Sequence, residues 1–195
     1  MAAPRIIAGT AKGMRLQDVP GDSTRPITDR VKESLFNIIG KDIEDSSILD
    51  LFGGTGSVGI EALSRGAKFA RFIDNHHFAA STIKKNLDYS HLKNQAEVFQ
   101  GDAFSYLHQN PDRKFEYIFI APPQYKRMWQ KAIKVLNDNP GWMCEDCWVI
   151  VQIHPIEYEK LELQHLREFE QRRYGSTLLV FYEIQAPPDV ENKFL

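Results

Sequence analysis

The chain has little cysteine, no long apolar run and almost no net charge, and each shortage excludes a class of protein. Cys144 and Cys147 are the two cysteines among 195 residues, so a disulfide-rich scaffold and a four-cysteine zinc site are both excluded. We expect two reduced thiols beside a strand, with a redox pair or a partial zinc site as the alternative. The six histidines are scattered without metal-ligand spacing, so we predict no metal. No apolar run approaches the length that crosses a membrane, so we predict no membrane partner.

The N-terminal residues bear on the cellular location of the protein, and the net charge bears on the partners that it can bind. Residues 1–5 contain no apolar core of a signal peptide, so we predict a cytoplasmic protein. The net charge of −2 provides no overall attraction to nucleic acid, so any RNA contact has to come from a local basic patch. A chain of 195 residues suits one domain with a sizeable core, and we expect a monomer.

The most informative stretch is the apolar run 48–52, which glycines at 53, 54, 56 and 59 follow. The run predicts a buried parallel strand, and the residues after Gly59 predict a helix. Glycine lets a backbone approach a ligand closely, and a helix N-terminus favours electron-rich groups. The spacing of Gly54, Gly56 and Gly59 fits G-x-G-x-x-G, which is a weak signal by itself. We predict a site for a nucleoside-type cofactor; a tight strand–helix turn without a ligand is the alternative.

Beyond residue 46, strands and helices alternate, which predicts a parallel α/β sheet with right-handed crossovers. The segments 169–174 and 177–182 face each other across Gly175-Ser176, which predicts a closing antiparallel hairpin. A mostly parallel sheet closed in this way departs from the NAD-binding folds and suits a Rossmann-like, class I S-adenosylmethionine (SAM)-dependent methyltransferase. The expected strands cover 47–52, 68–74, 96–100, 115–120 and 147–153, and the expected helices cover 57–65, 76–88, 102–109 and 125–137.

Residues 1–40 do not join this alternation, so we predict an N-terminal extension to a methyltransferase domain at 41–195. Residues 5–16 look like a short β-hairpin, and residues 17–27 look like a loop. Thr28 is a candidate N-cap for a helix that ends at Gly40. The extension carries six Lys or Arg residues against four acids, an excess of +2 that suits phosphate contacts. It is a candidate lid or RNA-binding appendage.

Acidic residues stand at the ends of three successive predicted strands. Because an open α/β sheet binds its ligand at the carboxyl ends of the strands, these side chains should share one site. Asp50 can hold the glycine loop or a cofactor ammonium group, Asp74 can bind ribose hydroxyls, and Asp102 can reach an adenine amino group. The alternative for each is a helix N-cap, and it is strongest for Asp102.

The fourth strand ends in Phe119-Ile120-Ala121-Pro122-Pro123-Gln124-Tyr125. Two consecutive prolines predict a rigid turn that neither continues the sheet nor starts a helix early. Its unpaired carbonyl groups could accept hydrogen bonds from an amino group in the cleft. An ordinary strand-terminating loop is the alternative.

These motifs together resemble the RsmD-type family of bacterial 16S rRNA guanine-N2 methyltransferases over nearly the whole chain. Residues 5–10 with Gly13 resemble the family's opening, and residues 25–38 (RPITDRVKESLFNI) resemble its most distinctive segment. Residues 50–59 are similar to its SAM loop, D-L-F-x-G-[ST]-G-x-x-G, and residues 173–175 to its closing hairpin. The resemblance implies SAM as the cofactor. It implies the exocyclic N2 amino group of a guanine as the acceptor, in 16S rRNA or in an assembling small ribosomal subunit.

The resemblance also implies roles for individual residues. Arg25, Thr28 and Arg30 would lie over the active site or contact RNA, with Arg5 and Lys12 extending that basic surface. Without the resemblance, the arginines at 25 and 30 are ordinary charges at a helix entry. The implied cofactor-binding residues are Asp50, Phe52, Gly53, Gly54, Gly56, Asp74, Asn75, Asp102 and Ala103.

One motif departs from the family, because Ala121-Pro122-Pro123-Gln124 stands where the family has [DN]-P-P-[YF]. In the usual motif the Asp or Asn accepts a hydrogen bond from the target amino group, and the aromatic ring stacks on the base. Ala121 has no side-chain acceptor, and Gln124 is not an aromatic ring.

Three interpretations of this loop follow. In an active enzyme, the carbonyls of Ala121 and Pro122 accept from the amino group, Gln124 bonds the base edge, and Tyr125 or Phe119 stacks. The alternatives are a relic of the family that binds RNA or SAM in ribosome assembly, and an enzyme with another substrate. We favour the active enzyme, with residues 121–125 as its catalytic loop, because methyl transfer depends chiefly on positioning. An NAD-dependent oxidoreductase is a further alternative, which the Pro-Pro loop and the closing hairpin disfavour.

Overall fold

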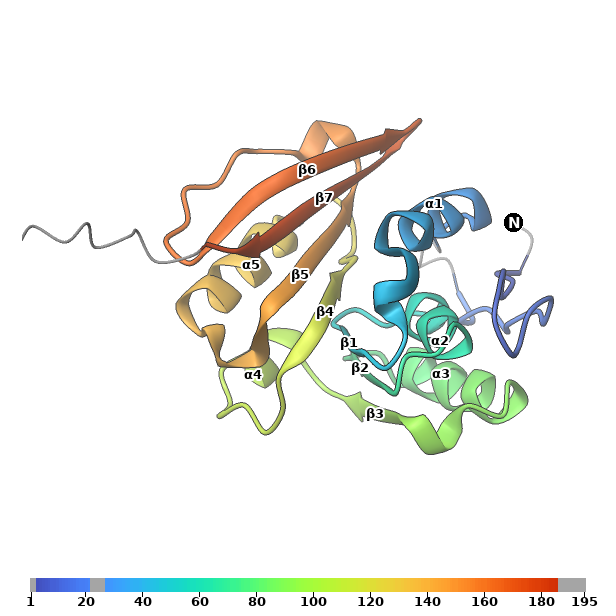
Figure 1. Cartoon of the computed structure of the whole chain (residues 1–195). Coiled ribbons are helices and arrows are strands. Elements are labelled where there is room, and N and C mark those ends of the chain that lie inside the picture. Colours follow the sequence, from blue (N-terminus) through green and yellow to red (C-terminus); the bar gives the residue numbers. More distant parts are fainter. Residues whose placement is uncertain (1–2, 22–26, 186–195) are drawn as a thin grey trace, which may run out of the picture.

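The computed structural model describes residues 3–21 and 27–185, which form a seven-stranded sheet between two layers of helices (Figure 1). The strands follow the order β3-β2-β1-β4-β5-β7-β6 across the sheet. β1 to β5 run parallel, and β7 is antiparallel to both β5 and β6. The strands are β1 (Ser47–Asp50), β2 (Phe69–Asp74), β3 (Ala96–Gln100), β4 (Phe115–Ile120), β5 (Met143–Ile153), β6 (Leu166–Tyr174) and β7 (Thr177–Ile184). The helices are α1 (Asp29–Ile39), α2 (Ser57–Ser64), α3 (His77–Tyr89), α4 (Ala103–Leu107) and α5 (Met128–Asp138).

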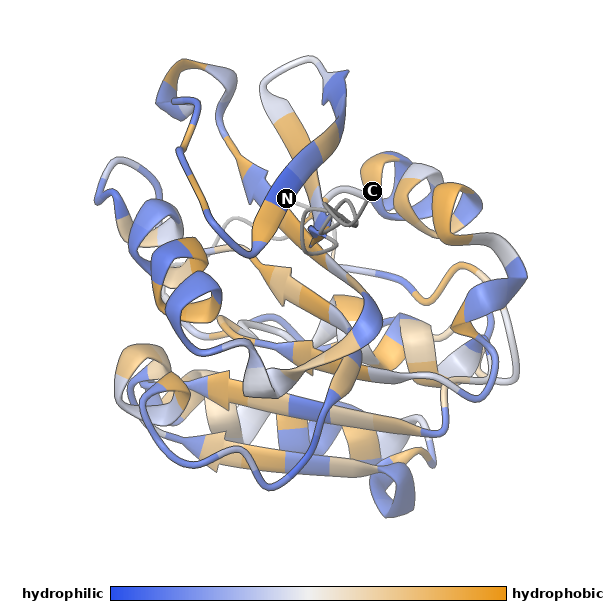
Figure 2. Ribbon diagram, turned by 60° about the vertical axis from the view of Figure 1, so that its left-hand side comes forward, coloured by the Kyte–Doolittle hydropathy of each residue, from blue (hydrophilic) through white to orange (hydrophobic). Residues whose placement is uncertain are grey.

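The two faces of the sheet carry separate hydrophobic cores, because successive side chains of a strand point to opposite faces. On β4, Tyr117 and Phe119 pack in the core shared with α1, α2 and α3. Ile118 and Ile120 pack in the core shared with α4 and α5. Figure 2 shows the apolar strands at the centre and the polar faces of the helices outside. Among the described residues, no helix is both long enough and apolar enough to span a membrane.

The predicted alternation and the closing hairpin are confirmed, and with them the class I methyltransferase fold. Several boundaries differ from the prediction by a few residues, and two of these differences concern the site or the cysteines. The helix predicted from residue 125 begins at Met128, because Tyr125 (φ 62°) and Arg127 (φ 52°) adopt left-handed backbone angles that interrupt it. β5 begins at Met143, so both cysteines lie within the strand; they are free, with Cys147 buried.

The β-hairpin predicted at residues 5–16 forms only in part. A single bridge pairs Arg5 with Arg15, with backbone hydrogen bonds from Ile6 N to Met14 O and from Gly13 N to Ile6 O. Between residues 7 and 11, backbone amides donate hydrogen bonds to Glu61 and Ser64 of α2 instead of pairing with a second strand. The segment approaches α2 so closely that position 9 has no room for a side chain: a Cβ on Gly9 would lie 1.6 Å from the backbone oxygen of Ser64 at the end of α2.

A buried ionic cluster attaches this N-terminal segment to the sheet domain. Glu61 of α2 is fully buried and accepts hydrogen bonds from the amides of Ile7 (2.7 Å) and Ala8 (3.0 Å). Its carboxylate also lies 2.7 Å from Arg65 Nε and 3.6 Å from the equally buried Lys32 Nζ. Two buried charges are tolerated only when they are paired and hydrogen-bonded, so the cluster holds α1 and the preceding turn against α2.

Candidate active site

A cleft of about 820 Å³ opens where the carboxyl ends of β1, β2 and β4 meet. Most of the predicted site lines it, which agrees with the rule that open α/β sheets bind ligands at this edge. Gly56 and Tyr125 do not line the cleft, and neither do Arg5, Lys12, Thr28 and Arg30, whereas Arg25 lies outside the described residues. The predicted residues that do line it are Asp50, Phe52, Gly53, Gly54, Asp74, Asn75, Asp102, Ala103, Ala121, Pro122, Pro123 and Gln124.

The glycine loop between β1 and α2 is shaped partly by packing and partly by backbone conformation. Gly56 is the N-cap of α2 with φ of 78°, a left-handed angle that glycine adopts without strain. Position 59 has room only for glycine, because a Cβ there would lie 2.4 Å from the ring of Phe72 on β2. The same close contact allows α2 to lie directly on the sheet, so that its N-terminal end is adjacent to the cleft.

Asp50, the last residue of β1, is 2% exposed. Burial raises the pKa of its carboxyl from 3.8 to about 7. The backbone amides of Gly59 and Phe52 lower this pKa, whereas the nearby charge of Asp74 raises it. Burial disfavours the ionised form of this carboxyl, and a nearby cation would stabilise that form. This end of the cleft therefore suits a positively charged ligand group.

The other two acids have structural partners. Asp74 accepts hydrogen bonds from the amides of Gly54 (2.9 Å) and His76 (2.8 Å), so it connects β2 to the glycine loop. Asp102 is the N-cap of α4 and accepts from Ser105 N at 2.8 Å, and this hydrogen bond lowers the pKa of its carboxyl. The N-cap alternative is therefore present in the structure for Asp102, which nevertheless lines the cleft.

The loop after β4 is held by a residue that the sequence did not indicate. Glu157, in the turn Pro155–Glu157 after β5, accepts a hydrogen bond from Tyr125 N at 2.6 Å and from His154 N at 3.2 Å. The rings of Tyr125 and His154 lie 6.2 Å apart, and Tyr125 is 67% exposed. The hydrogen bonds of Glu157 tie the loop after β4 to the turn after β5, and we call Glu157 the clamp of that loop.

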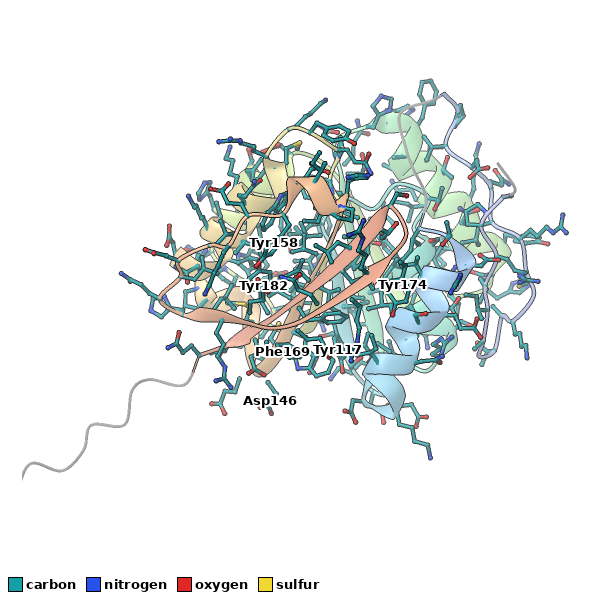
Figure 3. The ribbon with its side chains drawn as sticks, turned by 90° about the horizontal axis from the view of Figure 1, so that it is seen from above. Tyr117, Asp146, Tyr158, Phe169, Tyr174 and Tyr182 are labelled. Atoms are coloured by element: carbon teal, nitrogen blue, oxygen red, sulfur yellow. The ribbon has the colours of Figure 1, made fainter. Side chains whose placement is uncertain are left out.

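Several further lining residues were not among the predicted site residues. Val19 and Ile27 enter from the N-terminal extension, and Gln152 and Thr177 enter from β5 and β7. Thr177 starts β7, opposite Tyr174 at the end of β6. Figure 3 shows Tyr174 at this turn on the side of α1. The strand register brings Gln152 and Thr177 to the cleft, so spacing along the chain provided no signal for these two residues.

The described residues among those predicted to contact RNA lie on the surface of the N-terminal extension. Thr28 caps α1 by accepting a hydrogen bond from Val31 N at 3.4 Å. Arg5 forms an exposed ion pair with Asp29 at 3.3 Å, and Lys12 and Arg30 are exposed. Across residues 3–21 and 27–185, no group of three or more His, Cys, Asp or Glu side chains could hold a metal ion.

The sheet order and the cleft define a class I SAM-dependent methyltransferase, and SAM is the cofactor of that fold class. A solved structure, "Putative methyltransferase yhhF from Escherichia coli", matches with a TM-score of 0.84 and 30% identity over 94% of this chain and 99% of that one. The chain belongs to the family described as "Conserved hypothetical protein 95", whose model matches residues 4–183.

Two relatives confirm the resemblance to the RsmD-type family. "Putative rRNA methyltransferase YlbH" of Bacillus subtilis (strain 168) is 40% identical over 182 residues, which cover 92% of this chain and 98% of the relative. "Ribosomal RNA small subunit methyltransferase D" of Escherichia coli (strain K12) is 35% identical, over 76% of this chain and 73% of the relative.

Proposed function

We propose that this chain transfers a methyl group from SAM to the exocyclic N2 amino group of a guanine in 16S ribosomal RNA. The observation that carries the proposal is the single cleft in which the glycine loop, Asp50, Asp74 and the Ala121–Gln124 loop meet. The relatives named as rRNA methyltransferases support ribosomal RNA as the class of substrate. Free RNA and an assembling small subunit are both candidate forms of that substrate, in keeping with a monomeric cytoplasmic enzyme.

The residues at the β1–β2 end of the cleft fit SAM in charge and in hydrogen bonding. The buried Asp50 suits the positively charged end of the molecule, since a cation would favour its ionised form. Asp74 uses one lone pair of each oxygen for an amide and keeps acceptor capacity for ribose hydroxyls. Asp102 and Ala103, at the start of α4, would border the adenine. When bound, SAM supplies a methyl group that its sulfonium has already activated.

The remaining work of the chain is to orient the attacking nitrogen. The Ala121–Gln124 loop would hold the guanine at the β4 end of the cleft, with Gln124 on the base edge and the exposed ring of Tyr125 available for stacking. The nitrogen loses a proton to water as it gains the methyl group. Holding the nitrogen in line with the methyl group accounts for most of the rate, because positioning alone contributes about 7–11 kcal/mol in well-oriented reactions.

The RNA itself would lie across the N-terminal extension, residues 1–40, which we propose as a substrate-binding appendage to the domain at 41–195. Arg5, Lys12 and Arg30 are exposed there and can contact phosphates, whereas Lys32 is buried against Glu61 and cannot. Val19 and Ile27 join this surface to the cleft. Phosphate contacts of this kind position the RNA, and the cleft then selects the base.

The test is methyl transfer from labelled SAM to 16S rRNA and to small subunits that lack the modification, followed by nuclease digestion and identification of the methylated nucleoside. Asp50→Ala should abolish transfer and SAM binding measured by calorimetry. Asp146→Ala is the matched control, because that carboxylate is exposed near the amino end of β5, away from the cleft at the carboxyl ends of the strands (Figure 3). N2-methylguanosine that disappears in Asp50→Ala and persists in Asp146→Ala would support the proposal; a different methylated nucleoside would contradict it.

The missing side-chain acceptor at Ala121 favours a second candidate, a relic that binds SAM or RNA without catalysis. This candidate predicts SAM binding with no transfer to either RNA substrate. It also predicts that Ala121→Asp with Gln124→Tyr leaves RNA affinity nearly unchanged. The same transfer assay distinguishes the two candidates.

A further inference from the structure

We propose that Gln152 of β5 supplies the hydrogen-bond acceptor for the target amino group that Ala121 lacks. This assignment deepens the proposed function and rests on it. Ala121 lines the cleft directly after β4, and its side chain is a methyl group that cannot accept a hydrogen bond. An acceptor therefore has to come from another residue or from the backbone.

The strand register puts the two residues side by side. β4 and β5 are parallel neighbours, and their last pairs are Phe119 with Ile150 and Ile120 with Val151. The next residues along each chain are Ala121 and Gln152. Neighbouring strands lie about 4.8 Å apart, so the two positions are separated by one strand spacing.

Both side chains belong to the same face of the sheet. Phe119 and Ile150 pack in the core under α1, α2 and α3, and Ala121 packs against that same core. Ile120 and Val151 pack in the opposite core. Because side chains alternate along a strand, Gln152 shares the face of Ile150 and Ala121. Its side chain is longer than that of asparagine by one methylene, which helps it to reach sideways toward the place that an acceptor at 121 would occupy.

The Gln152 side chain has a free acceptor at this place. Its Oε1 is buried and has no hydrogen-bond partner within the described part of the chain. Buried polar atoms in folded proteins are nearly always paired, so an unpaired acceptor calls for an explanation. Of the four such atoms among the described residues, those of Trp129, Gln130 and Tyr182 belong to residues that do not line the cleft, whereas Gln152 lines it.

An amide oxygen suits the chemistry. It accepts one N–H of the guanine amino group and thereby orients the nitrogen lone pair, as an asparagine at 121 would. Being neutral, it does not take up the proton, which leaves for water after transfer. A substrate amino group would in turn satisfy the buried acceptor.

The test uses Gln152→Leu, which keeps the approximate volume and removes the acceptor. We expect kcat for methyl transfer to fall on the order of 10²-fold, because small displacements of the reacting nitrogen cost about this much. The Kd for SAM should stay within about twofold of wild type, since Gln152 would contact the base and not the cofactor. Gln130→Leu is the matched control: it also removes a buried, unpaired amide oxygen, on α5 and outside the cleft, and should leave kcat unchanged.

Rescue separates a role in orientation from a role in packing. Adding Ala121→Asn to Gln152→Leu places an acceptor back on the neighbouring strand and should restore most of kcat. Wild-type kcat in a folded Gln152→Leu protein would overturn the assignment, as would a loss of activity that Ala121→Asn does not reverse. A wild-type protein that transfers no methyl group to either RNA would instead refute the proposed function, and the assignment with it.

Discussion

Replacing the buried acid at the end of β1 tests the electrostatics of the cleft directly. The Asp50 carboxyl has a pKa of about 7 in the folded protein against an ordinary value of 3.8, a difference of about 3 units. At about 1.36 kcal/mol per unit, the ionised carboxylate destabilises the ligand-free fold by about 4 kcal/mol at pH 8. Because the folded state holds a proton that the unfolded state has lost, this destabilisation grows as the pH rises from about 4 to 7 and then levels off. The Asp50→Asn variant lacks this pH-dependent destabilisation, because its amide side chain is neutral at every pH.

We therefore expect Asp50→Asn to unfold at higher urea concentration than wild type at pH 8, and at nearly the same concentration at pH 4. The assay is urea unfolding of both proteins at several pH values without SAM, since the difference between them cancels the titration of other groups. SAM binding should show the opposite trend in wild type, strengthening as the pH rises through about 7 with proton release measurable by calorimetry in two buffers. Unfolding curves for the two proteins that stay parallel from pH 4 to 8 would refute a carboxylate destabilised by burial.

Three further predictions concern the supports of the site. Gly9→Ala should detach the N-terminal segment and cost at least about 2 kcal/mol, because the added Cβ cannot coexist with the α2 carbonyl 1.6 Å away; thermal unfolding and limited proteolysis would detect this. Lys32→Met should cost about 3 kcal/mol in urea unfolding, since it leaves the buried Glu61 with one cationic partner fewer. Glu157→Ala should lower kcat about tenfold with an unchanged Kd for SAM, because Tyr125 N loses its 2.6 Å acceptor and the loop after β4 loosens.

Each of these changes has a matched control. Gly101→Ala adds a Cβ that meets nothing within 4 Å, Lys41→Met removes an exposed lysine, and Glu159→Ala removes an exposed acid two residues after the clamp. Equal effects in a variant and its control would show that the named contact is not responsible. A Glu157→Ala protein that loses SAM affinity instead of kcat would place the clamp at the cofactor end of the cleft.

The parts of this protein that sequence alone determined are those in which the physics is local. A buried run followed by four glycines predicts a strand, a close turn and a helix, and the acids that end β1 and β2 or follow β3 are predicted by the same alternation. The closing hairpin was predictable for the same reason, since its turn joins adjacent residues. Even the alternative roles of Asp102 were visible, because an N-cap depends on residues only three positions apart.

Tertiary structure decided everything that depends on contacts between distant residues. Residues 5–16 looked like a hairpin, yet Glu61 and Ser64 of α2 accept hydrogen bonds from backbone amides between residues 7 and 11, so only the bridge between Arg5 and Arg15 forms. Glu157 became the clamp of the loop after β4 because the turn after β5 brings it to Tyr125. Gln152 lies beside Ala121 only because β4 and β5 pair in one register and not in another. The register of two strands follows from which of their faces are buried in the packed sheet, so the pairing of distant residues becomes visible only in the tertiary structure.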